Sequence, residues 1–198
     1  MTTYHDFEIT LLDVEPRTWR RFLVKKTARA TLVTLHAAIQ DAAGWQHAHL
    51  HAFHTPDGEP FANEMADDYD DTDVPLTSKK KLAAVFPGKG AGERLLYNYD
   101  FGDDWWVDVV HHGLVERAGG DQRLLLDGAG LWAPDDCGGV SGFARLQNVL
   151  LRRAEGERLT NDDQEFLAWA GDSATAFGLE ALRRRFHLNR TGTYRSVD

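Results

Sequence analysis

Residues 94–112, RLLYNYDFGDDWWVDVVHH, carry the clearest structural signal in the chain. Every second side chain on either side of Gly102 is apolar or aromatic, and side chains two apart lie on one face of a strand. The glycine and aspartates in the middle tolerate the left-handed backbone that a tight turn requires. The stretch therefore predicts a β-hairpin with strands over 94–101 and 105–112.

The N-terminal part of the chain predicts two further strands and a helix. Residues 4–14 and 18–25 alternate apolar and polar side chains, as strands do. Thr31 is a suitable N-cap and Gly44 a suitable stop for a helix between them, because threonine accepts hydrogen bonds from a helix start and glycine adopts the left-handed backbone. We expect a third strand over 45–54, WQHAHLHAFH.

The remainder of the chain predicts one loop and several helices. Residues 55–75 have no apolar period and are strongly acidic, so we expect a flexible acidic loop there. A short helix is expected over 78–86. Apolar side chains at helical spacing predict three more helices, which cover 143–153, 160–171 and 177–186.

Together these elements predict an α+β fold. We expect a mixed or antiparallel β-sheet with a helix after the second strand, a central β-hairpin, and C-terminal helices packed on the sheet. No linker or internal repeat divides the chain. We therefore expect a single domain over 1–198, with a sheet core over 4–143 and a helical C-terminal part over 144–190.

Composition limits the class of protein. The chain has 198 residues, of which 42% are hydrophobic and 27% charged, so it can bury a core and is not an extended disordered chain. No apolar stretch is long enough to cross a bilayer, and the N-terminus resembles no export signal. The single cysteine, Cys137, fits a reducing compartment. We expect a cytoplasmic protein without a membrane partner.

The charge distribution bears on nucleic acid as a partner. The net charge is −9, but eight acidic residues lie within 57–73, so the rest of the chain is close to neutral. A basic cluster near the N-terminus could bind a polyanion. We do not favour this interpretation, because the apolar residues between these side chains indicate a largely buried strand. The cluster consists of Arg17, Arg20, Arg21, Lys25, Lys26 and Arg29.

Three histidines suggest a metal site. His47, His49 and His51 alternate in the expected strand over 45–54 and would share a face. Imidazole is a common ligand for zinc and related metals, but a single strand spreads its side chains too far apart to complete a shell. Carboxylates from another element would have to join, and the available candidates are Asp100, Asp103, Asp104, Asp108, Asp135 and Asp136. From these we take His49, His51, Asp100 and Asp103 as the candidate ligands of a divalent metal. Alternatively, the histidines decorate a sheet face.

Cys137 is a poor candidate for a nucleophile. A reactive thiol needs a lowered pKa, which a neighbouring positive charge or a helix start supplies. Here the preceding residues are Asp135 and Asp136, whose negative charges raise the thiol pKa. We expect Cys137 to be a packed thiol.

Several motifs occur in a fixed order along almost the entire chain. They are Pro16-x-x-Trp19-Arg20-Arg21, Thr31-Leu32 with Leu35-His36 and Ile39-Gln40, Gly44-Trp45 with His49-Leu50-His51-x-Phe53, Tyr97-x-Tyr99-Asp100-Phe101-Gly102-Asp103-x-Trp105, Pro134-x-Asp136-Cys137-Gly138-Gly139, and Trp169 followed by Phe177-x-Leu179-Glu180. In these motifs the chain resembles the plasmid Ri ORF-three-like family, named from the Agrobacterium root-inducing plasmid. The resemblance implies a compact α+β domain and an association with plasmids and insertion sequences, and it implies no activity.

Two functions from different classes follow. The first is a non-catalytic binding or interaction module with an acidic and aromatic cleft, since no complete nucleophile, phosphate-loop or cofactor pattern is present. The alternative is a metal-dependent hydrolase, which could act on nucleic acid, with a metal-bound water as nucleophile. No cofactor other than a divalent metal is indicated. The cleft residues that we expect are Trp45, His49, His51, Tyr99, Asp100, Asp103 and Asp136.

Overall fold

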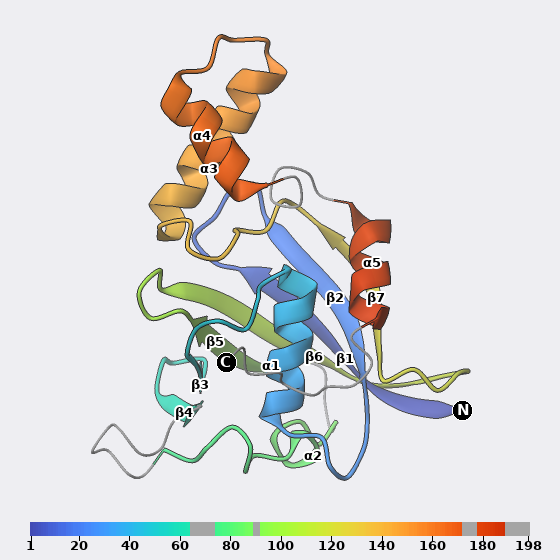
Figure 1. Cartoon of the computed structure of the whole chain (residues 1–198). Coiled ribbons are helices and arrows are strands. Elements are labelled where there is room, and N and C mark those ends of the chain that lie inside the picture. The colour runs from blue at the N-terminus through green and yellow to red at the C-terminus, as the bar shows by residue number, and fades with distance from the viewer. Residues whose placement is uncertain (64–73, 89–91, 172–177, 189–198) are drawn as a thin grey trace.

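A seven-stranded antiparallel sheet forms the centre of the computed structural model, which describes residues 1–63, 74–88, 92–171 and 178–188 (Figure 1). The strand order is β4-β3-β5-β6-β1-β2-β7. The strands are β1 (Thr2–Leu11), β2 (Thr18–Lys25), β3 (His51–His54), β4 (Pro60–Asn63), β5 (Glu93–Tyr99), β6 (Trp105–Arg117) and β7 (Arg123–Ala129). The helices are α1 (Leu32–Ala43), α2 (Leu82–Val85), α3 (Gly139–Ala154), α4 (Asn161–Ala170) and α5 (Leu179–Leu188). The expected α+β class is confirmed, and every strand pair is antiparallel.

The hairpin predicted from residues 94–112 is confirmed as β5 and β6. Tyr99 pairs with Trp105 at the turn, and Tyr97 pairs with Val107. All four side chains are buried, because the alternating positions face the core. The hairpin therefore supplies the aromatic centre of the sheet.

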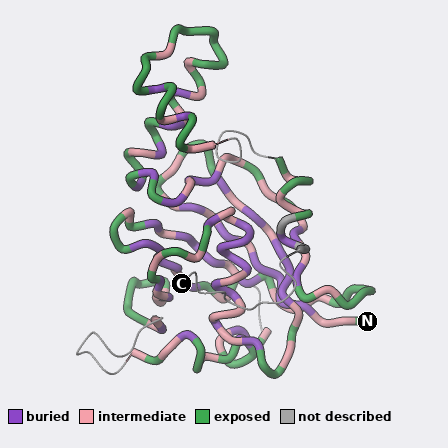
Figure 2. The backbone as a smooth tube through the Cα atoms, in the orientation of Figure 1, coloured by how far each residue is buried: buried purple, intermediate pink, exposed green. Residues whose placement is uncertain are grey.

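Helix α1 covers one face of the sheet (Figure 1). It ends where expected, since Gly44 adopts a left-handed φ of 90° and donates its N–H to the carbonyl of Gln40. Leu32, Leu35 and Ile39 line its buried side. Figure 2 shows that buried residues are concentrated in α1 and in the central strands of the sheet.

The expected third strand is shorter than predicted. The segment 45–50 is irregular, and only His51–His54 forms β3. His47 has a φ of 60°, which an extended strand does not allow. The expected acidic loop also differs, because Pro60–Asn63 pairs with β3 as β4. Residues 64–73 of that loop lie outside the described residues.

The C-terminal helices occupy two places. Helix α5 runs alongside β7 at the edge of the sheet, and its Phe186 ring lies 5.6 Å from that of Phe22 (Figure 1). Helix α3 meets the sheet through Phe143, which packs edge-on against Trp105. Helix α4 packs on α3, and the two stand off one end of the sheet (Figure 1).

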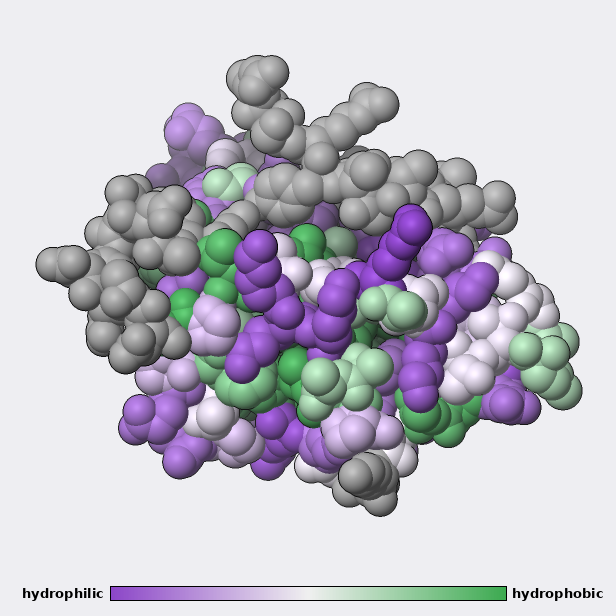
Figure 3. Space-filling view, turned by 90° about the horizontal axis from the view of Figure 1, so that it is seen from below, coloured by the Kyte–Doolittle hydropathy of each residue, from purple (hydrophilic) through white to green (hydrophobic). Residues whose placement is uncertain are grey.

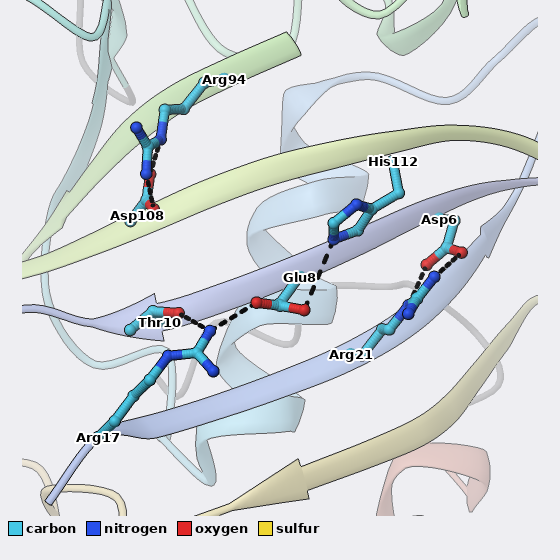
Figure 4. A network of polar contacts seen from close by, with 8 residues as sticks. All are labelled: Asp6, Glu8, Thr10, Arg17, Arg21, Arg94, Asp108 and His112. Atoms are coloured by element: carbon cyan, nitrogen blue, oxygen red, sulfur yellow. Dashed lines mark hydrogen bonds and ion pairs between the residues drawn. The ribbon is translucent and has the colours of Figure 1, made fainter. Parts of the chain in front are cut away.

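Charged side chains cover the sheet face opposite α1 (Figure 4). Arg17 contacts Glu8 at 2.6 Å and Arg94 contacts Asp108 at 2.6 Å. Two further pairs join neighbouring strands on this face (Figure 4). These are Arg21 with Asp6 and His112 with Glu8.

Half of the basic cluster expected near the N-terminus is engaged within the protein. Arg20 is buried and donates hydrogen bonds to the carbonyls of Trp19, Ala129 and Gly130. Arg17 and Arg21 form ion pairs with Glu8 and Asp6, whereas Lys26 and Arg29 are exposed.

No described helix combines the length and the apolar composition that crossing a bilayer requires.

Figure 3 shows the face of the molecule seen from below, on which hydrophilic and hydrophobic residues are interspersed.

Candidate functional site

Three loops bring His49, Asp100 and Asp136 together. His49 lies between α1 and β3, Asp100 begins the β5–β6 turn, and Asp136 precedes α3. The Nε2 atom of His49 lies 3.2 Å from Oδ1 of Asp136 and 3.7 Å from Oδ2 of Asp100. One ligand atom from each residue lies within 4.8 Å of the other two. We call these three residues the triad.

The triad is buried on one side and open on the other. The Asp136 side chain is 67% exposed, whereas those of His49 and Asp100 are 26% and 12% exposed. The Nε2 atom of His49 is itself buried and has no hydrogen-bond partner among the described residues, because its contact with Asp136 lacks hydrogen-bond geometry. In the tautomer that carries its proton on Nδ1, this nitrogen would present a lone pair to a cation between Asp100 and Asp136.

The backbone of the hairpin turn orients Asp100. This residue has a φ of 56°, a conformation that aspartate tolerates better than most side chains. Its N–H donates to the carbonyl of Leu50 at 3.0 Å, which ties the turn to the loop of His49. Its Oδ1 accepts a hydrogen bond from the N–H of Gly102, so Oδ2 is the oxygen that faces His49.

Asp103 connects the β5–β6 turn to the start of α3 by a hydrogen bond. Its Oδ2 accepts a hydrogen bond from the N–H of Gly138 at 3.1 Å. Gly138 and Gly139 have φ values of 89° and 65°, which place this backbone against the turn. Asp103 therefore holds the segment of Asp136 close to the other two triad residues, and it supplies none of the three converging ligand atoms.

Trp45 and Tyr99 form a buried aromatic layer next to the triad. Their rings stack with centroids 4.6 Å apart, and the Tyr99 ring lies edge-on to His49 at 5.7 Å. The indole N–H of Trp45 donates to the carbonyl of Ala133 at 2.9 Å. The Tyr99 hydroxyl accepts from the N–H of Ala48. These contacts fix the loops that precede His49 and Asp136.

Asp135 belongs to the same region, although sequence reasoning did not include it in the cleft. It is buried, and its Oδ2 accepts from the N–H of Gln46 at 2.7 Å. Burial raises the pKa of Asp135, and the Gln46 N–H and the Tyr99 hydroxyl partly offset this effect. Burial, and then the charge of Asp135, raise the pKa of Tyr99. The sequence shows two adjacent aspartates, Asp135 and Asp136, but it does not show which of the two side chains is buried.

His51 lies in a different cluster from His49. Its ring stacks on His36 with centroids 3.7 Å apart, and His36 Nδ1 lies 2.8 Å from the Tyr97 hydroxyl. His47 Nδ1 lies 3.3 Å from His36 Nε2. Burial is the main cause of the lowered pKa of His36, followed by the charges of His51 and His47. Because β3 begins only at His51, the expected alternation of the histidines does not extend to His49. Asp136, rather than His51 or Asp103, joins His49 and Asp100.

Cys137 is a buried thiol. Burial, followed by the negative charge of Asp103, raises its pKa from 9.0 to about 12. A thiol in that state is protonated at neutral pH and is a poor nucleophile.

Three comparisons with known proteins each found a match. A family model described as "Plasmid pRiA4b ORF-3-like protein" matches residues 3–185. A Sinorhizobium fredii protein, "Uncharacterized protein y4hQ", is 32% identical over 170 residues, which cover 84% of this chain and 80% of the relative. The crystal structure of "Protein of Unknown Function MM3350" from Methanosarcina mazei Go1 matches with a TM-score of 0.72 and 26% identity, over 91% of this chain and 96% of that one.

Proposed function

This chain belongs to the plasmid pRiA4b ORF-3-like protein family, and we propose that it is a non-catalytic binding module that holds a divalent cation at His49, Asp100 and Asp136. The observation that carries the proposal is the convergence of one imidazole nitrogen and two carboxylates from three separate loops. The hydrogen-bond network of Asp103 and the aromatic layer support it, because they order the loops that present these groups.

The donor set suits particular cations. Imidazole favours zinc, iron, cobalt and nickel, and carboxylates add manganese to the range. Metal–ligand bonds of about 2.1 Å place tetrahedral ligand atoms roughly 3.4 Å apart. The triad atoms lie at 3.2 and 3.7 Å for the two His49 contacts and within 4.8 Å overall. A small movement of the exposed Asp136 side chain would complete the geometry.

Charge balance also supports a cation. Asp100 and Asp136 are two carboxylates that share one imidazole, so a divalent ion would neutralise them both. Three protein ligands leave at least one coordination position for an external group. A bound cation would therefore be the point at which this module recognises a polar ligand.

The test is cation binding by protein that has carried no affinity tag. We expect isothermal titration with Zn²⁺, Mn²⁺ or Co²⁺ to show one site per chain. His49→Gln and Asp136→Asn should each weaken binding by at least about tenfold, because loss of even a group that only orients a metal ligand costs that much. His54→Gln is the matched control, since His54 lies in the same segment but faces the opposite side of the sheet against Trp106. Wild-type protein that binds no stoichiometric cation would end the proposal.

A cation held by three protein ligands would keep a coordination position for water, which favours a metal-dependent hydrolase as a second candidate. A metal-bound water has a pKa near 7 and can attack an ester or a phosphodiester. Chromogenic ester and phosphodiester substrates, assayed with and without the preferred cation, separate the two functions. Cation-dependent turnover that His49→Gln abolishes would establish the hydrolase, and cation binding without turnover would leave the binding module.

A further inference from the structure

Asp135 is a carboxylate that the fold buries without a positive partner. Only 8% of the residue is exposed. Its Oδ2 accepts from the N–H of Gln46 at 2.7 Å, whereas its Oδ1 is buried and forms no hydrogen bond of standard geometry with the described residues. The lysine and arginine ion pairs of the described chain are all made with other carboxylates. Such a group is costly to bury and calls for an explanation.

Asp135 connects two of the three segments that form the triad. It directly precedes Asp136 in the chain, and its bond to the N–H of Gln46 reaches the loop that carries His49. The Tyr99 hydroxyl adds a second connection. It interacts with the Asp135 carboxylate, and it accepts at 3.3 Å from the N–H of the residue before His49. One side chain therefore helps to fix the position of His49 relative to Asp136.

The charges around Asp135 are unbalanced. Burial is the main cause of its raised pKa; the charge of His49 acts to lower this pKa and that of Asp136 to raise it, so both groups lie within electrostatic reach. Asp100 belongs to the same cluster through its contact with His49. Three carboxylates thus share one imidazole. A cation at the triad would supply the positive charge that this region of the described structure lacks.

We propose that Asp135 is a positioning residue of the cation site: its contacts place the loop of His49, and its charge is kept in the interior because a bound cation offsets it. The inference rests on the proposed cation site. A carboxylate kept only for the fold would behave differently, since removing its charge would weaken the empty protein. A buried ion without a partner instead destabilises the empty protein, and an uncharged side chain of the same shape relieves that effect.

Asp135→Asn in the full chain tests the charge. Asparagine has the same shape, and its carbonyl oxygen can still accept from the N–H of Gln46. Isothermal titration with Co²⁺ measures cation affinity, and urea denaturation in EDTA measures the stability of the empty protein. We expect the variant to bind Co²⁺ about tenfold more weakly and to have a urea midpoint equal to or above that of the wild type. Glu165→Gln removes an exposed negative charge from α4 and should leave both unchanged.

Asp135→Ala tests the positioning contacts, because it removes the acceptor as well as the charge. It should bind Co²⁺ about tenfold more weakly than Asp135→Asn. Should the alanine variant not fold, Tyr99→Phe removes the second connection and should weaken Co²⁺ binding about threefold relative to the wild type.

Several results would overturn the inference while the wild type still binds Co²⁺. Wild-type affinity in Asp135→Asn, or a lowered urea midpoint of that variant in EDTA, would assign the charge of Asp135 to the fold. Equal affinities of the asparagine and alanine variants, or an unchanged affinity in Tyr99→Phe where that variant is used, would refute the positioning role. Failure of the wild type to bind Co²⁺ at all would instead refute the cation site on which the inference rests.

Discussion

Gly139 lies so close to Asp103 that a Cβ built on the glycine would stand 2.8 Å from the Asp103 carbonyl oxygen. Side chains do not normally tolerate such a contact, and the partner is a backbone atom that cannot rotate away. Gly139 also has a φ of 65°. The start of α3 can therefore reach the hairpin turn only with glycine at this position.

Gly139→Ala should destabilise the protein by about 3 kcal/mol, of which about 1 kcal/mol is left-handed strain and the rest the close contact. Gly156→Ala is the matched control, because Gly156 has a φ of 78° and nothing within 4 Å of a Cβ. It should cost only about 1 kcal/mol. Urea denaturation measures both values. Equal losses in the two variants would show that the contact with Asp103 does not constrain the fold.

Trp45→Phe tests the aromatic layer. The substitution removes the indole N–H that binds the Ala133 carbonyl, leaves that buried oxygen without its partner and opens a small cavity. We expect a loss of about 2–3 kcal/mol of unfolding free energy and weaker cation binding. Trp19→Phe, on the charged face of the sheet, is only partly buried and should cost less than about 1 kcal/mol. Wild-type cation affinity in Trp45→Phe would separate the aromatic layer from the triad.

The stability of the protein should fall in mild acid because of His5. Burial is the main cause that lowers the pKa of His5 from 6.5 to about 4, and the charges of His111 and Lys26 add to the effect. The unfolded chain therefore binds more protons than the folded one between about pH 6.5 and 4, so the contribution of His5 to stability is lost as pH falls through this window. Buried His111, 3.2 Å from His5, acts in the same direction, because burial lowers its pKa more than Glu93 raises it.

Urea midpoints at pH 7.5, 6 and 5 measure this dependence. His5→Gln keeps a hydrogen-bonding group opposite His111 and should flatten the decline. The neighbouring control His112→Gln alters an exposed side chain on the other face of the sheet and should preserve the wild-type slope. A slope that His5→Gln leaves unaltered would assign the acid sensitivity to other groups, such as buried His36.

Thr160→Ala should weaken the start of α4. The Thr160 hydroxyl accepts from the Asp163 N–H, and the Asp163 carboxylate accepts from the Thr160 N–H in return. Loss of this capping box should cost about 1 kcal/mol. Thr160→Ser retains the oxygen and should restore most of the loss. Cation binding should be unaffected in both variants, because α4 packs on α3 and supplies no triad residue.

Elements with strong local signals were predictable from sequence. The hairpin follows from alternating apolar residues around Gly102, and α1 ends at Gly44 as expected. The helix expected over 160–171 is confirmed as α4, which Thr160 and Asp163 cap at its start. In these cases the residues that determine the structure lie within a few positions of one another, so periodicity and capping chemistry are sufficient.

The composition of the site was less predictable, because it depends on backbone angles in loops. The left-handed φ of His47 interrupts the expected strand and separates His49 from His51. The same feature at Asp100 and Asp136 turns their carboxylates toward His49. Aspartates in one turn look alike in a sequence, and only the fold shows which faces the imidazole and which binds the backbone of Gly138.

The distribution of the triad over three distant segments has a thermodynamic consequence. An unfolded or half-assembled chain cannot hold the three groups together, so a cation would bind to the native state alone. The unfolding free energy would then rise with cation concentration by mass action, at about 1.4 kcal/mol for each tenfold increase beyond the dissociation constant. Release of the ion and global unfolding would become one linked event, and the melting temperature of the protein would report the supply of metal in its surroundings.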